Sequence, residues 1–267
     1  MAARRPPGLG LQLYTVRDAV AADLPGALRR VAGFGYAGVE TLGTYGLSPR
    51  GLADVLDDSG LAWVSTFVGL GDLDTFAGEL EGLADAGCAR VVVPFLAPDA
   101  FTDRASISRA AELLSAATAI GADRGVRVGY HNHYWELAPV DGRPALERLF
   151  DEIDPRTIAE VDVYWAQVGG VDPAALVRAL GTRVRLLHVK DGPAADAQQA
   201  MTAVGAGVVD IGAVLDAAAH AEWHVVELDQ FAGDVWDAVE VSARYLLDRG
   251  GSRGAGRPRR AERRDAR

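Results

Sequence analysis

The chain has 267 residues, 49% of them hydrophobic, a length that exceeds one ordinary domain but suits an α/β barrel folded as a single unit. Its net charge of −10 argues against a nucleic-acid partner, because binding to a phosphate backbone requires a basic surface. One cysteine, Cys88, excludes an internal disulfide, and there is neither an apolar leader nor an apolar window of membrane length, so we expect a cytoplasmic protein with no membrane partner.

Short apolar or β-branched segments recur along the chain. We expect strands at residues 9–16, 37–42, 62–68, 89–96, 126–131, 158–165, 184–190 and 224–231. Several of these segments are apolar throughout rather than alternating, a pattern typical of parallel strands that are covered on both faces.

Segments with helical periodicity lie between these strands and carry start and stop signals. Helix starts, where a side-chain oxygen would accept hydrogen bonds from free backbone N–H groups, are predicted at Asp18, Ser48–Pro49, Asp72, Asp103, Asp141, Asp172, Asp210 and Asp234. Left-handed residues that end helices are predicted at Gly35, Gly60, Gly87 and Gly125.

Eight strand–helix units of about thirty residues predict an α/β fold with a single (β/α)8 TIM barrel over residues 9–249. A doubly wound open sheet is the alternative, but it usually carries a glycine-rich phosphate loop after the first strand, where this chain has YTVRDAV. Residues 250–267 are rich in glycine and arginine and are predicted to form a disordered tail.

The C-terminal ends of the strands form the active-site face of such a barrel. The predicted strand ends carry His131, Asp162, His188 and Glu227, a mixed nitrogen and oxygen set that suits a divalent cation. A lone acidic residue at a strand end is often a cap or a turn residue, but here four strands deliver a metal-ligand type to the same layer. We therefore predict one bound divalent metal ion, with Mn²⁺ favoured and Co²⁺, Zn²⁺, Mg²⁺ or Fe²⁺ as alternatives.

The body of the chain carries a family resemblance in seven motifs: GLQLYTVRD, GYAGVE, YHNHYWEL, VDVYWAQVGGVDP, LHVKD, VGAGVVDIGAVL and VVELDQF. In this order they resemble the sugar phosphate isomerase/epimerase family, which has a xylose isomerase-like TIM barrel and includes epimerases and inosose dehydratases. The resemblance implies a metal held by Glu, Asp, His and Glu, and Asp162, His188 and Glu227 match the last three. His131 replaces the first glutamate, and a histidine-rich end of the fifth strand resembles the inosose dehydratase branch.

The resemblance implies an isomerase or epimerase that removes the proton α to the ketone of a keto-sugar, through an enediolate intermediate. An inosose-type dehydratase or a keto-glycoside lyase, using the same proton abstraction, is the alternative. The implied catalytic residues are Glu227, Lys190, His133 and Glu40, and the implied substrate-binding residues are Gln12, Tyr14, Thr66 and Trp165. The metal-ligand role could belong to His133 instead of His131.

Two other classes of protein stay open. A metal-dependent phosphodiesterase of the endonuclease IV type would need more histidines than the five present, together with basic loops facing DNA. A barrel without chemistry, acting as a binding subunit, is favoured by the missing glutamate of the fifth strand. The expected partner is a small-molecule carbohydrate, modestly favoured as unphosphorylated, and a homo-oligomer or a partner subunit is left open.

Overall fold

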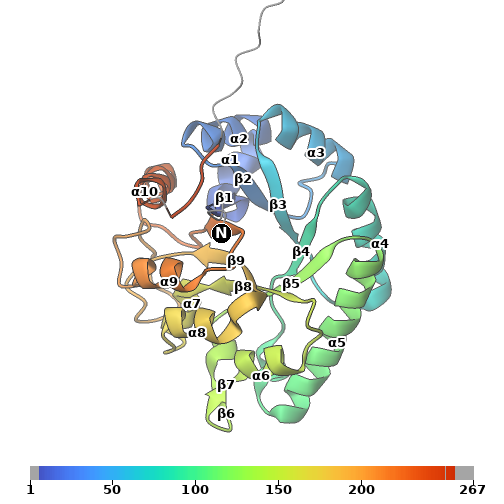
Figure 1. Ribbon diagram of the computed structural model, residues 1–267. Helices are drawn as coiled ribbons and strands as arrows, with labels where there is room; N and C mark the ends of the chain where they lie inside the picture. The colour runs from blue at the N-terminus through green and yellow to red at the C-terminus, as the bar shows by residue number, and fades with distance from the viewer. Residues whose placement is uncertain (1–5, 250, 256–267) are drawn as a thin grey trace, which may run out of the picture.

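The computed structural model describes residues 6–249 and 251–255. Within them, eight parallel strands form a closed barrel surrounded by helices, which confirms the predicted TIM-barrel fold (Figure 1). The barrel consists of β1 (Gly8–Gln12), β2 (Gly38–Leu42), β3 (Ala62–Phe67), β4 (Arg90–Val93), β5 (Arg127–His131), β8 (Ile158–Asp162), β9 (Val184–Val189) and β10 (Trp223–Val226). Each strand pairs with its neighbours in sequence, and β10 closes the barrel onto β1.

Helices alternate with the strands and lie on the outside of the barrel (Figure 1). The α-helices are α1 (Arg17–Ala22), α2 (Leu24–Gly33), α3 (Pro49–Asp58), α4 (Leu73–Asp85), α5 (Arg104–Asp123), α6 (Ala145–Glu152), α7 (Val163–Val168), α8 (Pro173–Leu180), α9 (Ile211–Ala217) and α10 (Val235–Asp248). Short 3-10 helices are η1 (Leu13–Val16), η2 (Pro98–Phe101), η3 (Trp135–Leu137) and η4 (Gly181–Arg183). Within the described residues, none of these helices has the length and apolar character needed to cross a membrane.

Most of the predicted helix starts are confirmed, and two are wrong. Caps with the expected hydrogen bond are found at Ser48, Asp72, Asp103, Asp172, Asp210 and Asp234. Asp18 instead lies in the first turn of α1, and Asp23 caps α2 by accepting a hydrogen bond from the backbone N–H of Gly26. Asp141 and Gly142 have φ angles of 47° and 78° and turn the hairpin of β6 (Pro139–Val140) and β7 (Arg143–Pro144), as the two central residues of a tight hairpin require.

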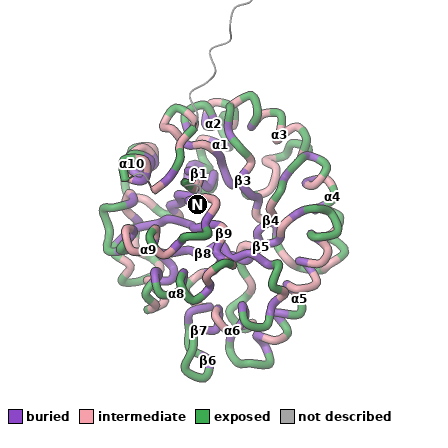
Figure 2. Tube along the Cα trace, viewed as in Figure 1, coloured by how far each residue is buried: buried purple, intermediate pink, exposed green. Residues whose placement is uncertain are grey.

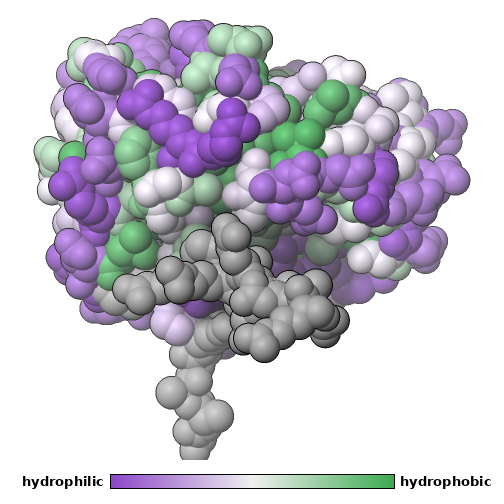
Figure 3. Space-filling view, turned by 90° about the horizontal axis from the view of Figure 1, so that it is seen from above, coloured by the Kyte–Doolittle hydropathy of each residue, from purple (hydrophilic) through white to green (hydrophobic). Residues whose placement is uncertain are grey.

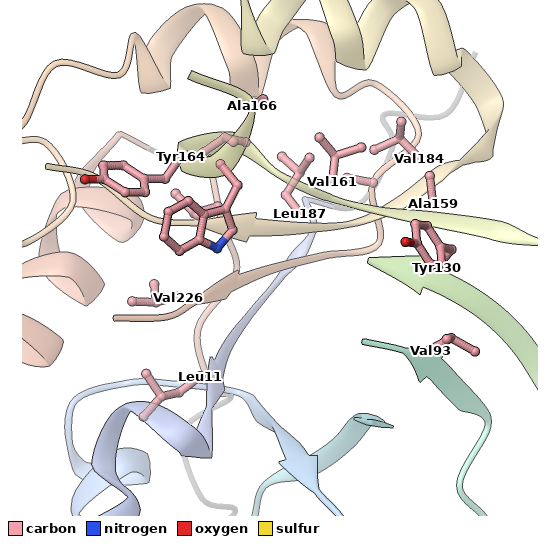
Figure 4. Close-up of a cluster of buried hydrophobic side chains, with 14 of the residues drawn as sticks. Leu11, Val93, Tyr130, Ala159, Val161, Tyr164, Ala166, Val184, Leu187 and Val226 are labelled. Carbon is pink, nitrogen blue, oxygen red and sulfur yellow. The ribbon is translucent and has the colours of Figure 1, made fainter. Parts of the chain in front are cut away.

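Strand residues alternate between the barrel interior and the shell of helices. The shell contains buried apolar side chains from many strands, including Leu11, Tyr130, Val161, Leu187 and Val226 (Figure 4). The residue that follows each of these in sequence points inwards, at the C-terminal end of its strand. Figure 2 shows the same division, with buried strands at the centre and exposed outer faces on the helices. Figure 3 shows hydrophilic residues interspersed with smaller hydrophobic patches on the visible outer surface.

The middle of the barrel is filled by a separate apolar cluster of Val64, Val92, Ile158, Leu186 and Val225, with Trp223 packed against it. Trp223 occupies space that glycines leave free. A Cβ atom on Gly8 would lie 2.4 Å from the Trp223 ring, and a Cβ atom on Gly38 would lie 2.7 Å from the carbonyl oxygen of Ala62. These two glycines therefore allow the large indole to fill the barrel below the site.

A charged network lies at the N-terminal end of the barrel. The Glu222 carboxylate accepts hydrogen bonds from Arg90, Arg127 and Arg185, and the Arg127 guanidinium reaches it with two bonds of 2.9 and 2.7 Å. Burial alone would raise the pKa of Glu222, but the three guanidinium groups lower it well below its usual value. This end of a TIM barrel contributes to stability rather than to catalysis.

The described C-terminal residues return to the barrel. The predicted domain ends at residue 249, whereas the carbonyl of Arg253 accepts a hydrogen bond of 2.9 Å from the backbone N–H of Leu9 in β1. The side chain of Ser252 lies 2.9 Å from Nδ1 of His224. Residues 251–255 are therefore packed against β1 and β10, and the predicted disorder of residues 256–267 lies outside the described residues.

Candidate active site

Ionisable side chains from β2, β5, β8, β9 and β10 meet inside the C-terminal end of the barrel. Each is less than 5% exposed, and together they are Glu40, His131, Glu160, Asp162, His188, Lys190 and Glu227. All lie at inward positions of their strands or just beyond the strand ends, so the alternation of strand residues brings them together. Six of the seven were predicted from the sequence.

His188 lies at the centre of this cluster. Its Nδ1 is 2.9 Å from Oε2 of Glu227, and its Nε2 is 2.6 Å from Oε1 of Glu40. Oε2 of Glu160 lies 3.4 Å from the same Nε2 atom. Burial alone would lower the pKa of His188, but the three surrounding carboxylates outweigh burial and hold its pKa well above the usual value.

Among the described residues, Lys190 is the only lysine or arginine in this cluster. Its ammonium group lies 3.0 Å from Oδ2 of Asp162, 2.5 Å from Oε2 of Glu227 and 2.8 Å from Oδ2 of Asp229. Burial lowers the pKa of Lys190, but these carboxylates raise it well above its usual value overall. Lys190 and His188 in turn hold the pKa of Glu227 well below its usual value, although burial opposes them. Lys190 therefore stays charged and Glu227 stays ionised.

Glu40 is oriented by its neighbours in the barrel. Nε2 of Gln12 donates a hydrogen bond of 2.7 Å to Oε1 of Glu40, and the Ser65 hydroxyl donates to Oε2. Thr66, the predicted substrate-binding residue of β3, instead has its hydroxyl 2.8 Å from the hydroxyl of Thr41, away from the cluster. The reason is an irregularity in the pairing of β2 with β3, which shifts the register so that Ser65 lies opposite Glu40.

The end of β5 presents two neutral histidines. Burial, followed by the charge of His188, lowers the pKa of His131 well below its usual value. Burial and the charge of Lys190 lower the pKa of His133 to about 4. The Glu136 carboxylate fixes this segment, because it accepts hydrogen bonds from the backbone N–H of His133 at 3.0 Å and from the hydroxyl of Tyr130 at 2.8 Å.

Asp162 combines a structural and a chemical role at the end of β8. Its Oδ1 accepts a hydrogen bond of 2.8 Å from the backbone N–H of Trp165 and so caps α7, while Oδ2 faces Lys190. Its own backbone N–H donates to the side-chain oxygen of Asn132, which ties β8 to the end of β5. Burial raises the pKa of Asp162 to about 6, although Lys190 and His188 oppose the rise.

Glu160 is the residue of this cluster that the sequence interpretation missed. Neither of its carboxylate oxygens accepts a hydrogen bond from the described residues, and Oε2 lies 3.4 Å from Nδ1 of His131. Burial and the charge of Glu40 raise its pKa well above the usual value. The signal was present in the sequence, since Glu160 is an acidic residue inside an apolar strand and shares a face with Asp162, two residues later.

Aromatic rings form the wall of the site beside β4, β5 and β8. The imidazole of His133 stacks on Trp135, with ring centroids 4.4 Å apart and planes at 10°, and lies edge-on to Phe95. The ring of Trp165 lies 5.4 Å from Nζ of Lys190, and its indole N–H has no hydrogen-bond partner among the described residues. Tyr14 lies farther out, with 37% of its surface exposed.

Two groups of side chains in this site could hold a divalent cation. One consists of His131, Glu160 and His188, and the other of Asp162, His188 and Glu227, and the ligand atoms within each group lie within 4.8 Å of one another. Three of the four predicted ligands thus fall in one group, and His131 falls in the other. The orphaned oxygens of Glu160 and the unpaired Nδ1 of His131 fit a cation, because buried acceptors without donors are otherwise costly.

The chain matches known proteins in sequence and in structure. Residues 28–244 match the family model of the xylose isomerase-like TIM barrel. Inosose dehydratase from Geobacillus kaustophilus (strain HTA426) is 28% identical over 209 residues, which cover 69% of this chain and 64% of that enzyme. This chain therefore spans less than two thirds of the length of that dehydratase.

Solved structures share the fold over almost the whole chain. A sugar phosphate isomerase/epimerase from Parabacteroides distasonis ATCC 8503 has a TM-score of 0.76 at 24% identity, with 92% of this chain and 95% of that chain covered. D-allulose 3-epimerase from Methylomonas sp. has a TM-score of 0.68 at 16% identity, with 93% and 100% covered. The family model covers most of the barrel and all of the strands that carry the central cluster. The chain therefore belongs to the xylose isomerase-like TIM barrel family.

Proposed function

We propose that this protein is a divalent-metal-dependent isomerase or epimerase, which acts on a keto-sugar or related carbohydrate through an enediolate intermediate. The observation that carries the proposal is the arrangement around His188, where the carboxylates of Glu40, Glu160 and Glu227 approach one imidazole inside the barrel mouth. Acid–base chemistry on a sugar needs such positioned proton-transfer groups. The family relationship to sugar isomerases, epimerases and dehydratases agrees with this chemistry.

The cation would be held by His131, Asp162, His188 and Glu227, with Glu160 as a further ligand that the orphaned oxygens favour. Mn²⁺ suits this set of imidazole and carboxylate ligands, and Co²⁺, Zn²⁺, Mg²⁺ or Fe²⁺ are alternatives. When bound, a divalent cation acts as a Lewis acid that stabilises negative charge developing on the substrate. Its positive charge would also offset the excess of carboxylates in the site.

The protein groups have distinct proposed roles in proton transfer. Glu227, which stays ionised beside Lys190, is the proposed base that removes the proton α to the ketone. The charged ammonium of Lys190 stabilises the enediolate oxygen. Glu40, on the other side of His188, donates the second proton or binds a sugar hydroxyl. His133 is neutral above about pH 5, so it can accept a proton or a hydrogen bond.

An inosose-type dehydratase or a keto-glycoside lyase is the second candidate. The similarity to inosose dehydratase and the two histidines at the end of β5 favour it. The first step would be the same removal of the α proton, and a β-substituent would then leave as water or as an alcohol. Lys190, which stays charged and lies beside the Trp165 ring, would protonate such a leaving group, and His133 lies near the same ring.

The test combines metal analysis with NMR of candidate ketoses and inososes in D₂O. Wild-type protein should contain about one metal ion per chain and should exchange the α proton of its substrate for deuterium. His131→Ala should lower the metal affinity by at least about tenfold, because even residues that only support a metal ligand have effects of this size. His220→Ala, which changes an exposed histidine outside the barrel, should keep wild-type metal content.

The product distinguishes the two candidates. A stereoisomer or a positional isomer of the substrate supports the isomerase, and a product that lacks one water supports the dehydratase. Absence of metal from both the wild type and His131→Ala after reconstitution with Mn²⁺, Co²⁺ and Zn²⁺ would contradict the metal-dependent mechanism and favour a binding subunit.

A further inference from the structure

We propose that the substrate carries an aromatic-sized apolar group in addition to its sugar, and that this group binds in a cavity on the rim of the barrel beside β1 and β2. The inference rests on the proposed function, because it names the class of substrate, an aryl or similarly apolar glycoside of a keto-sugar. It also makes a prediction about binding that can fail independently of metal chemistry.

The cavity has a volume of about 390 Å³ and mainly apolar walls. Its lining comes from η1, α1, α2 and the end of β2, and includes Leu13, Tyr14, Val20, Leu24, Leu42 and Tyr45. A cavity of this size lies in the range of small-molecule pockets and exceeds the needs of one aromatic ring. The one charged side chain in its wall is Arg17, whose guanidinium stacks 4.4 Å from the Tyr14 ring centroid.

Two residues connect this cavity to the cluster around His188. Leu42 lines the cavity and follows Glu40 by two residues in β2, so both side chains point to the same side of the strand, about 6.6 Å apart along it. Gln12 donates to Glu40 and accepts a hydrogen bond of 3.2 Å from the backbone N–H of Tyr14. A substituent on a sugar bound beside Glu40 therefore has a short path into the cavity.

Exposed apolar residues concentrate at this end of the barrel. Among the described residues, seven large hydrophobic side chains are exposed, and six of them lie on strand ends or loops of the C-terminal face: Tyr14, Leu42, Leu47, Phe95, Tyr134 and Val208. Leu42 is 48% exposed although it points towards the barrel mouth. Free sugars and cyclic polyols offer little apolar surface for such residues, whereas an aromatic substituent in the cavity would bury Tyr14 and Leu42, the two of the six that line it.

A small molecule fits these observations better than a second protein does. The six residues are spread over separate loops, whereas a stable protein interface buries about 800 Å² on each partner in one patch. The cavity itself is concave and is bounded by η1, α1, α2 and the end of β2, which is the form of a ligand site.

The experiment compares two ligands with the same sugar, 4-nitrophenyl β-D-glucopyranoside and methyl β-D-glucopyranoside, by isothermal titration calorimetry of the full chain. Ala21→Trp places an indole in the cavity from an exposed position of α1 that lines it. Ala22→Trp is the matched control, because Ala22 is the next residue of the same helix, is exposed and does not line the cavity.

The wild type and Ala22→Trp should bind the nitrophenyl glycoside at least about tenfold more tightly than the methyl glycoside, as expected for burial of one aromatic ring. Ala21→Trp should reduce this preference to less than about threefold. Equal affinities in the wild type, no binding of the nitrophenyl glycoside, or an unchanged preference in Ala21→Trp would overturn the inference. A change of oligomeric state caused by Ala21→Trp alone, in sedimentation velocity, would also overturn it by assigning the cavity to a protein interface.

Metal content and deuterium exchange of a free ketose are measured on the same three proteins. If the proposed function fails, the wild type lacks metal or exchange whatever its preference between the glycosides. If only the substrate inference fails, metal and exchange are present and the preference for the aromatic ligand is absent. The two failures are therefore distinguishable.

Discussion

The two ends of the barrel contain carboxylates in opposite environments, Glu160 buried without a hydrogen-bond partner among the described residues and Glu222 partly buried among three arginines, and the same substitution should have opposite effects on them. Glu160→Gln replaces an ionisable carboxyl group by a neutral amide at a side chain that is 1% exposed and accepts no hydrogen bond from the described residues. Folding raises the pKa of Glu160 above its ordinary 4.5, so the folded state holds a proton that the unfolded state releases. Glu160 therefore lowers the unfolding free energy of the metal-free protein by an amount that increases as the pH rises above 4.5.

A buried polar group without a partner costs about 1–3 kcal/mol, and a charged group costs more. Glutamine takes up no proton on folding but leaves an amide in the same place, so we expect Glu160→Gln to be about 2 kcal/mol more stable than the metal-free wild type near pH 7.5. For a protein of this size, that gain raises Tm by about 4–8 °C. Near pH 4.5 the two proteins should have similar Tm values.

Glu222→Gln is the matched comparison at the other end. It replaces the carboxylate that accepts five hydrogen bonds from Arg90, Arg127 and Arg185 by an amide, which has one acceptor oxygen instead of two and no negative charge. The contribution of a partly buried ion pair to stability lies between that of a surface pair and that of a buried pair. We therefore expect Glu222→Gln to lower the unfolding free energy by about 2 kcal/mol and Tm by about 4–8 °C. The pKa of Glu222 is lowered on folding, so the loss is complete above pH 4.5 and shrinks as the pH falls below it.

The assay is thermal unfolding by circular dichroism of both variants and the wild type, after removal of metals with EDTA, from about pH 4 to about pH 8. A Glu160→Gln protein that is less stable than the wild type near pH 7.5 would refute the reasoning. So would a stability difference that does not change with pH, because the effect would then come from packing rather than from charge.

Three further predictions concern single residues. The Cε1 proton of His133 should keep one chemical shift between about pH 5 and pH 8 in NMR titration, since its pKa is lowered to about 4, and an inflection near pH 6.5 would contradict this. Trp165→Phe keeps an aromatic ring but removes the unpaired indole N–H and part of a buried side chain, so we expect KM for the substrate to rise about tenfold and Tm to fall slightly, and an unchanged KM would exclude a hydrogen bond to the substrate. Gly38→Ala should lower the unfolding free energy by about 2–3 kcal/mol in chemical denaturation, because its Cβ would meet the carbonyl of Ala62. Gly78→Ala, in the interior of α4 with open space around it, should instead raise the unfolding free energy by about 0.5–1 kcal/mol.

The sequence predicted the positions of the eight strands and most of the site because both depend on local patterns. Two of the predicted strands, at residues 9–16 and 158–165, were too long, because Leu13–Val16 forms η1 and Val163–Val168 forms α7. Apolar runs mark the strands, and an ionisable residue at the end of such a run must point into the barrel mouth or remain buried without a partner. His131, Asp162, His188 and Glu227 were all found in this way. Glu160 was not predicted, because it lies one inward position deeper in β8 than Asp162, below the strand ends that form the active-site face.

Other features depend on contacts between segments and could not be predicted from local patterns. Whether Ser65 or Thr66 faces the interior is decided by the register of β3 against β2, and the irregularity in that pairing has no signature in the sequence of either strand. Thr66 therefore has a hydroxyl group that could bind a sugar, but this hydroxyl lies beside Thr41 and not in the cluster. The loop at Asp141 contains a typical hairpin dipeptide, Asp-Gly, but an acidic residue near a predicted helix also suits a cap.

The position of Glu160 also changes how the substitution at the end of β5 is interpreted. The family resemblance implies a glutamate where this chain has His131, which suggested an incomplete site. The structure places the Glu160 carboxylate 3.4 Å from that histidine and 3.4 Å from His188. An acidic group is therefore still present on this side of the cluster, supplied by β8 instead of β5. If Glu160 binds the cation, the loss of the β5 glutamate has changed the geometry of the site without removing the carboxylate that its chemistry needs, and the case for a barrel without catalytic activity becomes weaker.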